Sequence, residues 1–168
     1  MTIHFFCLSR PVLFLFIFIS TILMTDFSFA NDSQQQKVTQ ITFELGELSI
    51  LSKGQSHTFD VEVAQSFEQR ARGLMFRREM PEKNGMLFLF ENNQMVTMWM
   101  ENTYIPLDII FLNRKGIITH IVKSAVPESR DYIHSRVPVV SVLELNGGVT
   151  DNLNIQVGDI IEHPFFTE

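Results

Sequence analysis

The sequence predicts a mainly β protein, a compact single-domain β-sandwich or barrel-like fold with one or two short helices. A length of 168 residues fits one domain that is large enough to bury a core. Short apolar or alternating segments recur at roughly eight-to-twelve-residue spacing between turn residues, which is typical of sandwiches and barrels. Only two short segments change to a helical pattern, so helices are a minor part of the expected fold.

The first 30 residues have the pattern of a secretory signal peptide. Arg10 precedes an apolar run over residues 11–24, and the small residues Ser28 and Ala30 follow at the spacing of a processing site. The run has about 14 residues, fewer than the roughly 20 that a helix needs to cross a bilayer core. We therefore expect cleavage after Ala30, export to the periplasm or the medium, and no transmembrane span in the mature chain. An uncleaved anchor is the alternative.

Removal of this segment changes the composition. Seven of the 16 Phe and the only cysteine, Cys7, lie within it. A mature chain without thiols excludes Cys nucleophiles, thiolate metal sites and disulfides. The net charge of −6 argues against nucleic acid as a partner. Residues 31–37 are polar and are expected to form a disordered leader to one domain over residues 38–168.

The expected strands follow from alternation, apolar runs and turn residues. Residues 41–45 alternate and resume at Leu48 and Ile50 after a break at Gly46, and residues 58–63 alternate cleanly. The continuous apolar run 86–90 predicts a strand buried on both faces. Turns are expected at 52–55, 91–93 and 113–116, and the remaining strands at 95–100, 107–112, 117–125, 137–145 and 160–163.

Two helical segments interrupt this pattern. Ser66 and Gln69 have the spacing of a capping box, in which each side chain satisfies a backbone N–H of the other residue. The box predicts a short helix from Phe67 to about Arg72, with Gly73 at its C-terminal end. A single helical turn is expected near residues 150–153, after a glycine pair that suits positive φ at a strand exit.

Several motifs occur in a distinctive order. They are Gly-Leu-Met-Phe-Arg at 73–77, Gly-Met-Leu-Phe at 85–88, Trp-Met-Glu-Asn-Thr-Tyr-Ile-Pro-Leu-Asp-Ile-Ile-Phe at 99–111, Val-Leu-Glu-Leu-Asn-Gly-Gly at 142–148 and Val-Gly-Asp at 157–159. This series resembles the bacterial and archaeal domain-of-unknown-function family 192 over about residues 59–161. The resemblance implies a compact β-sandwich domain, often behind a signal peptide, and it carries no established activity and hence no catalytic residue. Glu101 departs from the family pattern, where Lys is commoner, so a positive charge there is not a requirement.

Two carboxylates lie inside apolar strands. Asp108 and Glu144 would each be costly to bury alone, so each needs a partner or must face solvent. One hypothesis is that they act as acid and base in the cleavage of a carbohydrate or an envelope polymer. Beside them, the polar side chains of Asn102, Thr103 and Tyr104 could line a pocket. Structural ion pairs or outward-facing carboxylates are the alternative.

Methionine is concentrated around the single tryptophan. Thioethers are soft ligands that select Cu(I), so Met98 and Met100, beside Trp99, suggest a copper-binding protein as one alternative. Alternation along a strand places these two methionines on one face and Met95 with Trp99 on the other. The competing interpretation is that methionine fills irregular gaps in the core.

Arginine is concentrated in the first helix and in the residues just after it. A cluster of this kind can recognise a carboxylate or phosphate through bidentate contacts, or form a solvated, salt-bridged face with the interleaved glutamates. The arginines are Arg70, Arg72, Arg77 and Arg78, and the glutamates are Glu68, Glu79 and Glu82.

The function that these observations favour is a non-enzymatic ligand-binding or accessory module of the cell envelope. Its expected recognition surface runs from Trp99 to Asp108, with Arg77 and Glu144 nearby. The hydrolase and the copper protein stay open as alternatives, and the sequence does not decide whether the chain is an enzyme. No cofactor is expected, because no phosphate loop, dinucleotide fingerprint or paired zinc motif is present.

Overall fold

The computed structural model describes residues 40–166, so the predicted signal peptide (1–30) and leader (31–37) lie outside the described residues. The strands are β1 (Glu44–Ser52), β2 (Gln55–Ala64), β3 (Asn84–Gln94), β4 (Thr97–Met98), β5 (Leu107–Leu112), β6 (Ile118–Ala125), β7 (Ile133–His134), β8 (Val139–Asn146) and β9 (Ile160–Glu162). The helices are α1 (Phe67–Arg72), α2 (Val149–Asn152) and the 3₁₀ turn η1 (Pro164–Phe166). None of the helices in this part of the chain is long and apolar enough to cross a membrane.

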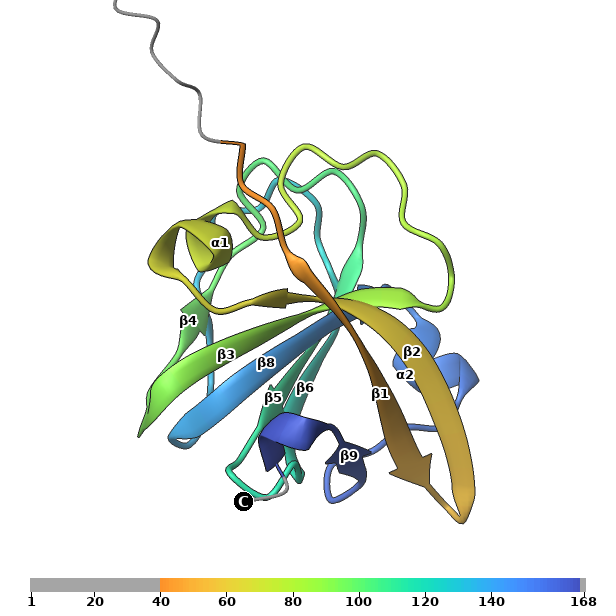
Figure 1. Ribbon diagram of the computed structural model, residues 1–168. Coiled ribbons are helices and arrows are strands. Elements are labelled where there is room, and N and C mark those ends of the chain that lie inside the picture. The colour runs from red at the N-terminus through yellow and green to blue at the C-terminus, as the bar shows by residue number, and fades with distance from the viewer. Residues whose placement is uncertain (1–39, 167–168) are drawn as a thin grey trace, which may run out of the picture. The chain divides into compact units, whose positions relative to one another are not determined.

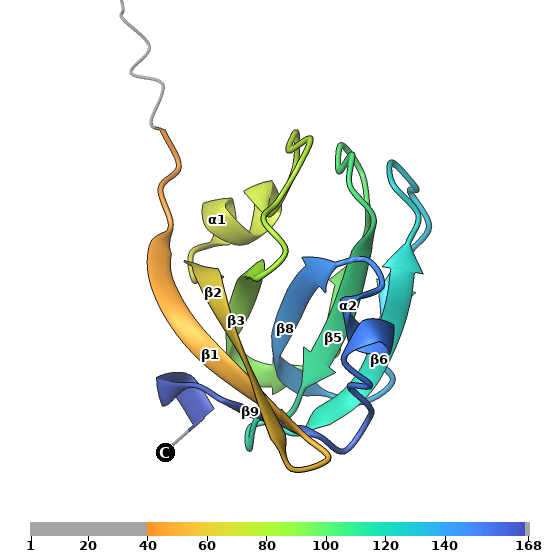
Figure 2. The ribbon, with the colours of Figure 1, turned by 90° about the vertical axis from the view of Figure 1, so that its right-hand side faces the viewer.

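Seven strands form one curled sheet in the order β6-β5-β8-β3-β2-β1-β9, which closes into a half-barrel (Figures 1 and 2). The expected mainly β fold is thus confirmed. All neighbours in this sheet are antiparallel except β2 and β3, which are parallel and are joined by the long connection that contains α1. The short strands β4 and β7 pair separately.

Most of the expected elements are present, and three differ. The predicted turn over residues 91–93 is wrong, because β3 continues through these residues to Gln94. The predicted break at Gly46 is wrong, because β1 runs through Gly46 and pairs there with Val61. The predicted strand over residues 95–100 shrinks to the two residues of β4. The residues on either side of β4 form hydrogen bonds with a loop instead. The Val96 N–H donates to Ser135 Oγ at 2.9 Å, and the Met100 N–H donates to the Ser129 carbonyl at 3.1 Å.

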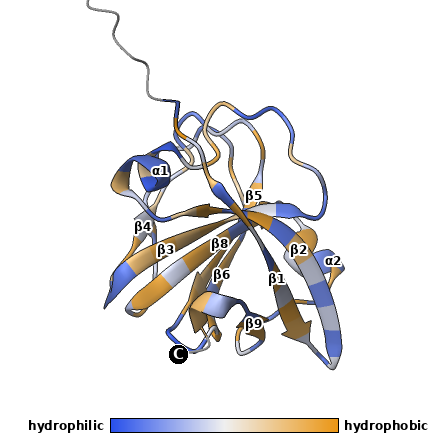
Figure 3. Ribbon diagram, in the orientation of Figure 1, coloured by the Kyte–Doolittle hydropathy of each residue, from blue (hydrophilic) through white to orange (hydrophobic). Residues whose placement is uncertain are grey.

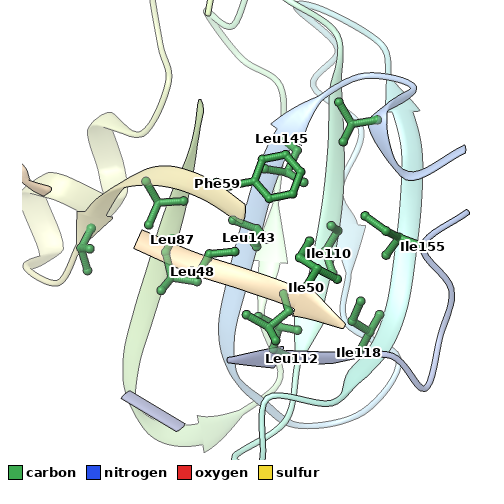
Figure 4. Close-up of a cluster of buried hydrophobic side chains, with 14 residues drawn as sticks. Leu48, Ile50, Phe59, Leu87, Ile110, Leu112, Ile118, Leu143, Leu145 and Ile155 are labelled. Carbon is green, nitrogen blue, oxygen red and sulfur yellow. The ribbon is translucent and has the colours of Figure 1, made fainter. Parts of the chain in front are cut away.

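The sheet has an apolar cluster on each face, as the alternating side chains of a doubly covered sheet require. Inside the half-barrel, side chains from β1, β2, β3, β5, β6 and β8 point toward one another (Figure 4). On the other face, a second cluster, which we call the outer cluster, lies under α1, β4 and the loops that follow them. The central strand β8 is buried on both faces, and most of its ribbon is coloured hydrophobic, whereas β2 alternates between hydrophobic and hydrophilic residues (Figure 3).

The close contact between β3 and β8 depends on Gly85. A Cβ at this position would lie 2.6 Å from the Glu144 carbonyl oxygen and 2.7 Å from Leu145 Cδ2. We expect Gly85→Ala to lower the free energy of unfolding by about 1–3 kcal/mol, because the two strands must separate to admit the methyl group. Urea denaturation measures this loss, and Ser56→Ala on the exposed part of β2 is the control. Equal stability of the two variants would contradict the prediction.

Candidate functional site

Glu144 lies toward the C-terminal end of β8, opposite Met86 of β3 and Ile109 of β5. The residue is only 4% exposed. Among the described residues, no side chain or backbone group forms a hydrogen bond or ion pair with its carboxyl group. Burial raises the pKa of Glu144 to about 8, so the group is mostly a neutral acid at pH 7. A buried carboxyl without an internal partner is unusual for a structural residue and typical of a functional site.

The side chain of Glu144 faces a small hollow of about 40 Å³, which we call the Glu144 hollow. Residues 70–75, from α1 and the turn after it, form one wall, and Phe88 of β3 lies beside them. Met98, Trp99 and Thr103 form the opposite wall. The hollow therefore combines one buried acid with apolar side chains and two arginines, at residues 70 and 72.

The first wall is positioned by the capped helix that the sequence predicts. Ser66 Oγ accepts from the Gln69 N–H at 3.1 Å, and Gln69 Oε1 accepts from the Ser66 N–H at 2.9 Å. The helix ends at Gly73, whose φ of +45° lies in the region that favours glycine. A Cβ at Gly73 would lie 3.3 Å from the Phe88 ring, so glycine also lets the turn pack closely against β3.

Asn102 joins the two walls. Its carbonyl oxygen accepts from the Phe76 N–H at 2.8 Å, and its side-chain amide lies 3.9 Å from the Met75 sulfur. Asn102 has a φ of +56°, which asparagine tolerates better than most residues. The next residue, Thr103, is buried and donates its backbone N–H to the Met100 carbonyl at 3.0 Å. The loop is thus held by backbone contacts that leave the hollow open between the walls.

Exposed aromatic and arginine side chains also lie on the segments that carry the two walls of the hollow. The Arg72 guanidinium lies 4.8 Å from the centre of the Phe76 ring, and Phe76 contacts Tyr104 edge-on at 6.2 Å. Arg78 lies over Tyr104 at 5.4 Å. The loops that carry these residues, 73–83 and 99–106, rise from the same end of the sheet as the loop after β6 (Figure 2). This end of the domain is therefore its aromatic-rich surface.

Asp108 does not belong to this site. It pairs with Leu145 across β5 and β8, whereas Glu144 pairs with Ile109, so the two carboxyls lie on opposite faces of the sheet. Asp108 is fully buried and accepts four hydrogen bonds. They come from the backbone N–H groups of Ser124, Gly148 and Thr150 at 2.8–3.0 Å and from Thr150 Oγ1 at 2.6 Å. Asp108 and Glu144 thus do not share the cleft that two-carboxylate glycoside cleavage requires.

Arg77 contacts a different acid. Its two terminal nitrogens each lie 2.6 Å from an oxygen of Glu62, in a bidentate ion pair. Glu62 and Glu144 flank Met86 in one row across β2, β3 and β8, roughly 10 Å apart at two strand spacings. Arg77 therefore neutralises Glu62 beside the site and is not a partner of Glu144.

The methionines divide between the hollow and the core. Met98 lines the hollow, whereas Met100 is buried in the outer cluster and does not line it. Met75 lines the hollow as well. Within residues 40–166, no group of three or more His, Cys, Asp or Glu side chains could hold a metal ion.

The structure brings together Trp99, Thr103 and Glu144 of the predicted site residues, with Asn102 and Tyr104 on the same loop. Sequence reasoning missed Gly73, Met75 and Phe88. The signal for the first two was the Gly-Leu-Met-Phe-Arg motif at 73–77, which carried the family resemblance but was assigned no part in a site.

Fold and site together define a mainly β domain of one curled sheet, with a buried acid in a hollow at its loop-bearing end. The chain belongs to the domain-of-unknown-function family 192, described as "Uncharacterized ACR", whose model matches residues 49–163. No match is found among curated proteins.

Two crystal structures are similar to this chain. A candidate transcription regulator from Sinorhizobium meliloti 1021 is 41% identical with a TM-score of 0.71, over 73% of this chain and 95% of that one. A protein of unknown function from Novosphingobium aromaticivorans DSM 12444 is 36% identical with a TM-score of 0.70, over 72% of this chain and 86% of that one. The regulator description belongs to that protein alone.

Proposed function

We propose that this protein is an exported, non-enzymatic ligand-binding module of the cell envelope and that the Glu144 hollow is its binding site. The main support for this proposal is the buried Glu144 carboxyl. This carboxyl faces an open hollow and has no hydrogen-bond partner among the described residues. In the same domain, the buried Asp108 carboxyl has four hydrogen bonds. Because buried polar groups are normally paired, the group that pairs with Glu144 is a ligand.

The composition of the hollow supports binding over acid–base catalysis. Within residues 40–166, Glu144 is the only carboxyl among the residues that line the hollow. The nearest acid in its row, Glu62, is occupied by Arg77 at both oxygens. A two-carboxylate hydrolysis needs a second free acid or base facing the same bond. Binding needs only a fitting shape, some apolar contact and a few polar groups that fix orientation.

The location of the protein follows from the first 30 residues. Their basic start, short apolar run and small-residue site support export, with cleavage after Ala30. Fractionation of cells that express the full chain with a C-terminal tag measures this directly. The tagged protein is expected outside the cytoplasm and shorter by 30 residues, as determined by mass spectrometry of the intact chain. Tagged protein that stays in the cytoplasm at full length would contradict export.

Binding is tested with the exported protein, labelled with ¹⁵N, and a soluble lysozyme digest of peptidoglycan as the probe. We expect the digest to shift the NMR signals of the Trp99 indole N–H and of the Gly73 and Thr103 amides, because these groups line the hollow. Trp99→Ala is expected to weaken binding at least about fivefold, as loss of an aromatic anchor does. Phe165→Ala, on the exposed turn η1, is the matched control.

Two results would overturn the proposal. One is a set of shifts that avoids the three reporter groups, which would place binding elsewhere. The other is time-dependent cleavage of the digest, followed by mass spectrometry and lost in Glu144→Gln, which would make the protein an enzyme.

A further inference from the structure

We propose that the Glu144 hollow takes a carboxylate group of its ligand, held between the acid at the floor of the hollow and the Arg72 guanidinium at its mouth. This inference rests on the proposed function, and it names the chemical class of the ligand. It follows from the charges that line the hollow, from the size of the hollow and from the free donors around it.

The charges that line the hollow favour an anion. Among the described residues that line it, Arg70 and Arg72 are the only basic ones. Arg70 donates to the carbonyls of Leu89 and Gln65, which carry no charge. Arg72 lies over the Phe76 ring and, among the described residues, forms no hydrogen bond or ion pair. Neither guanidinium forms an ion pair with a carboxylate, although the exposed Glu68, whose pKa is lowered by hydrogen bonds and also by Arg70, lies near Arg70. The acid at the floor is itself mostly uncharged at pH 7.

The size of the hollow suits a small planar group. Its volume is about 40 Å³, and a cavity needs roughly 10–15 Å³ of this measure to hold one water molecule. Room for about three heavy atoms is the size of a carboxylate, whereas a tetrahedral phosphate is larger. The ligand beyond this group would extend past Trp99, which is 43% exposed and offers an apolar face to its stem.

The donors around the hollow match the two carboxylate oxygens. A protonated Glu144 donates one O–H hydrogen bond, which is strong when the acceptor is ionised. Arg72 has a planar fork of N–H groups that can contact the second oxygen, or both oxygens, in bidentate fashion. The ligand carboxylate thus receives a proton donor from the floor and a positive charge from the mouth.

Other charged groups on this face are already paired or lie apart. Glu62 is paired with Arg77, and Glu101 lies 3.1 Å from Arg130. On β6, His120 stacks on Phe111, and burial together with the nearby Arg136 lowers its pKa. Glu144 is therefore the group whose ionisation changes the charge of the hollow above neutral pH, and ionised Glu144 would repel a bound carboxylate.

The test is a titration of the exported protein with sodium propionate, followed by the Gly73 and Thr103 amides in NMR spectra at constant ionic strength. Between pH 6.5 and pH 9.5 the affinity is expected to fall at least tenfold, because Glu144 loses the proton that it donates. In Glu144→Gln the affinity is expected to change less than twofold over the same range, since an amide donates at both pH values.

Arginine variants separate a specific contact from general attraction. Arg72→Gln is expected to weaken propionate binding about tenfold, as the loss of a charge-assisted contact does. Arg78→Gln removes an equal charge nearby, but Arg78 lies over Tyr104 and does not line the hollow. We expect this control to bind within twofold of the unaltered protein.

Parallel titrations with propylamine and inorganic phosphate complete the test. Tighter binding of either probe than of propionate, or propionate binding that is equal at both pH values, overturns the carboxylate assignment. If propionate leaves Gly73 and Thr103 unchanged while the peptidoglycan digest shifts them, this inference alone fails. If no probe shifts them, the proposed function fails with it.

Discussion

Asp108→Ala is expected to lower the free energy of unfolding by at least about 3 kcal/mol, a large share of the stability of a single domain. The fully buried carboxylate joins the end of β6, through the Ser124 N–H, to the start of α2, through Gly148 and Thr150. Its removal leaves three backbone N–H groups and one hydroxyl without acceptors. Urea denaturation at pH 7 measures the loss as a lower midpoint.

The control for Asp108 is Asp151→Ala, which removes an exposed carboxylate of α2 that pairs with Lys123. Exposed pairs contribute roughly 0–1 kcal/mol, so this variant should stay close to the unaltered protein. Asp108→Asn keeps the size of the side chain and one acceptor oxygen and should lie between the two. A loss of less than about 1 kcal/mol in the free energy of unfolding for Asp108→Ala would show that Asp108 does not hold β6 and α2 together.

Glu144 is expected to make the protein less stable as the pH rises from 5 to 8. Burial raises the pKa of Glu144 from 4.5 to about 8 in the folded state, so the folded protein holds a proton that the unfolded chain has released. Stability therefore falls by up to about 1.4 kcal/mol per pH unit in this window. Below pH 4.5 both states are protonated, and above pH 8 both are ionised, so the slope disappears at each end.

The comparison with Glu144→Gln isolates this effect. The variant has no titratable group at the site, and it should be more stable than the unaltered protein at pH 8 by a few kcal/mol. His120 and His163 have lowered pKa values, which act in the opposite direction near pH 6, but they are present in both proteins. Parallel stability curves for the two proteins between pH 5 and pH 8 would show that Glu144 titrates normally.

Local patterns predict the elements of the fold well. The alternation of residues 58–63 and the apolar run at 107–112 match β2 and β5, and the capping box at Ser66 defines α1. Most of the strand expected over residues 95–100 is absent, because its apolar side chains pack against the outer cluster while its backbone forms hydrogen bonds with a loop that is distant in the sequence. That competition between sheet and loop is a tertiary effect, which a local pattern does not contain.

The residues of the site were predictable from the sequence only in part. Glu144 was singled out because an acid within an apolar strand needs an explanation, and the same logic selected Asp108. The register of β8 against β3 puts Glu144 on the face of the hollow, and the register of β5 against β8 puts Asp108 on the opposite face. A shift of β5 by one residue would turn Asp108 to the same face as Glu144. Met75 and Gly73 were missed because they enter the site only through the path of the chain after α1.

The parallel pairing of β2 with β3 has a consequence for engineering. Parallel strands cannot be joined by a tight turn, so the sheet itself demands a long connection, here residues 65–83. That same segment supplies one wall of the Glu144 hollow. Residues 65–83 are therefore a segment that can be replaced as a unit. If Gly73 is kept for its packing on Phe88, variation of this segment should change ligand preference while the register of the sheet stays intact.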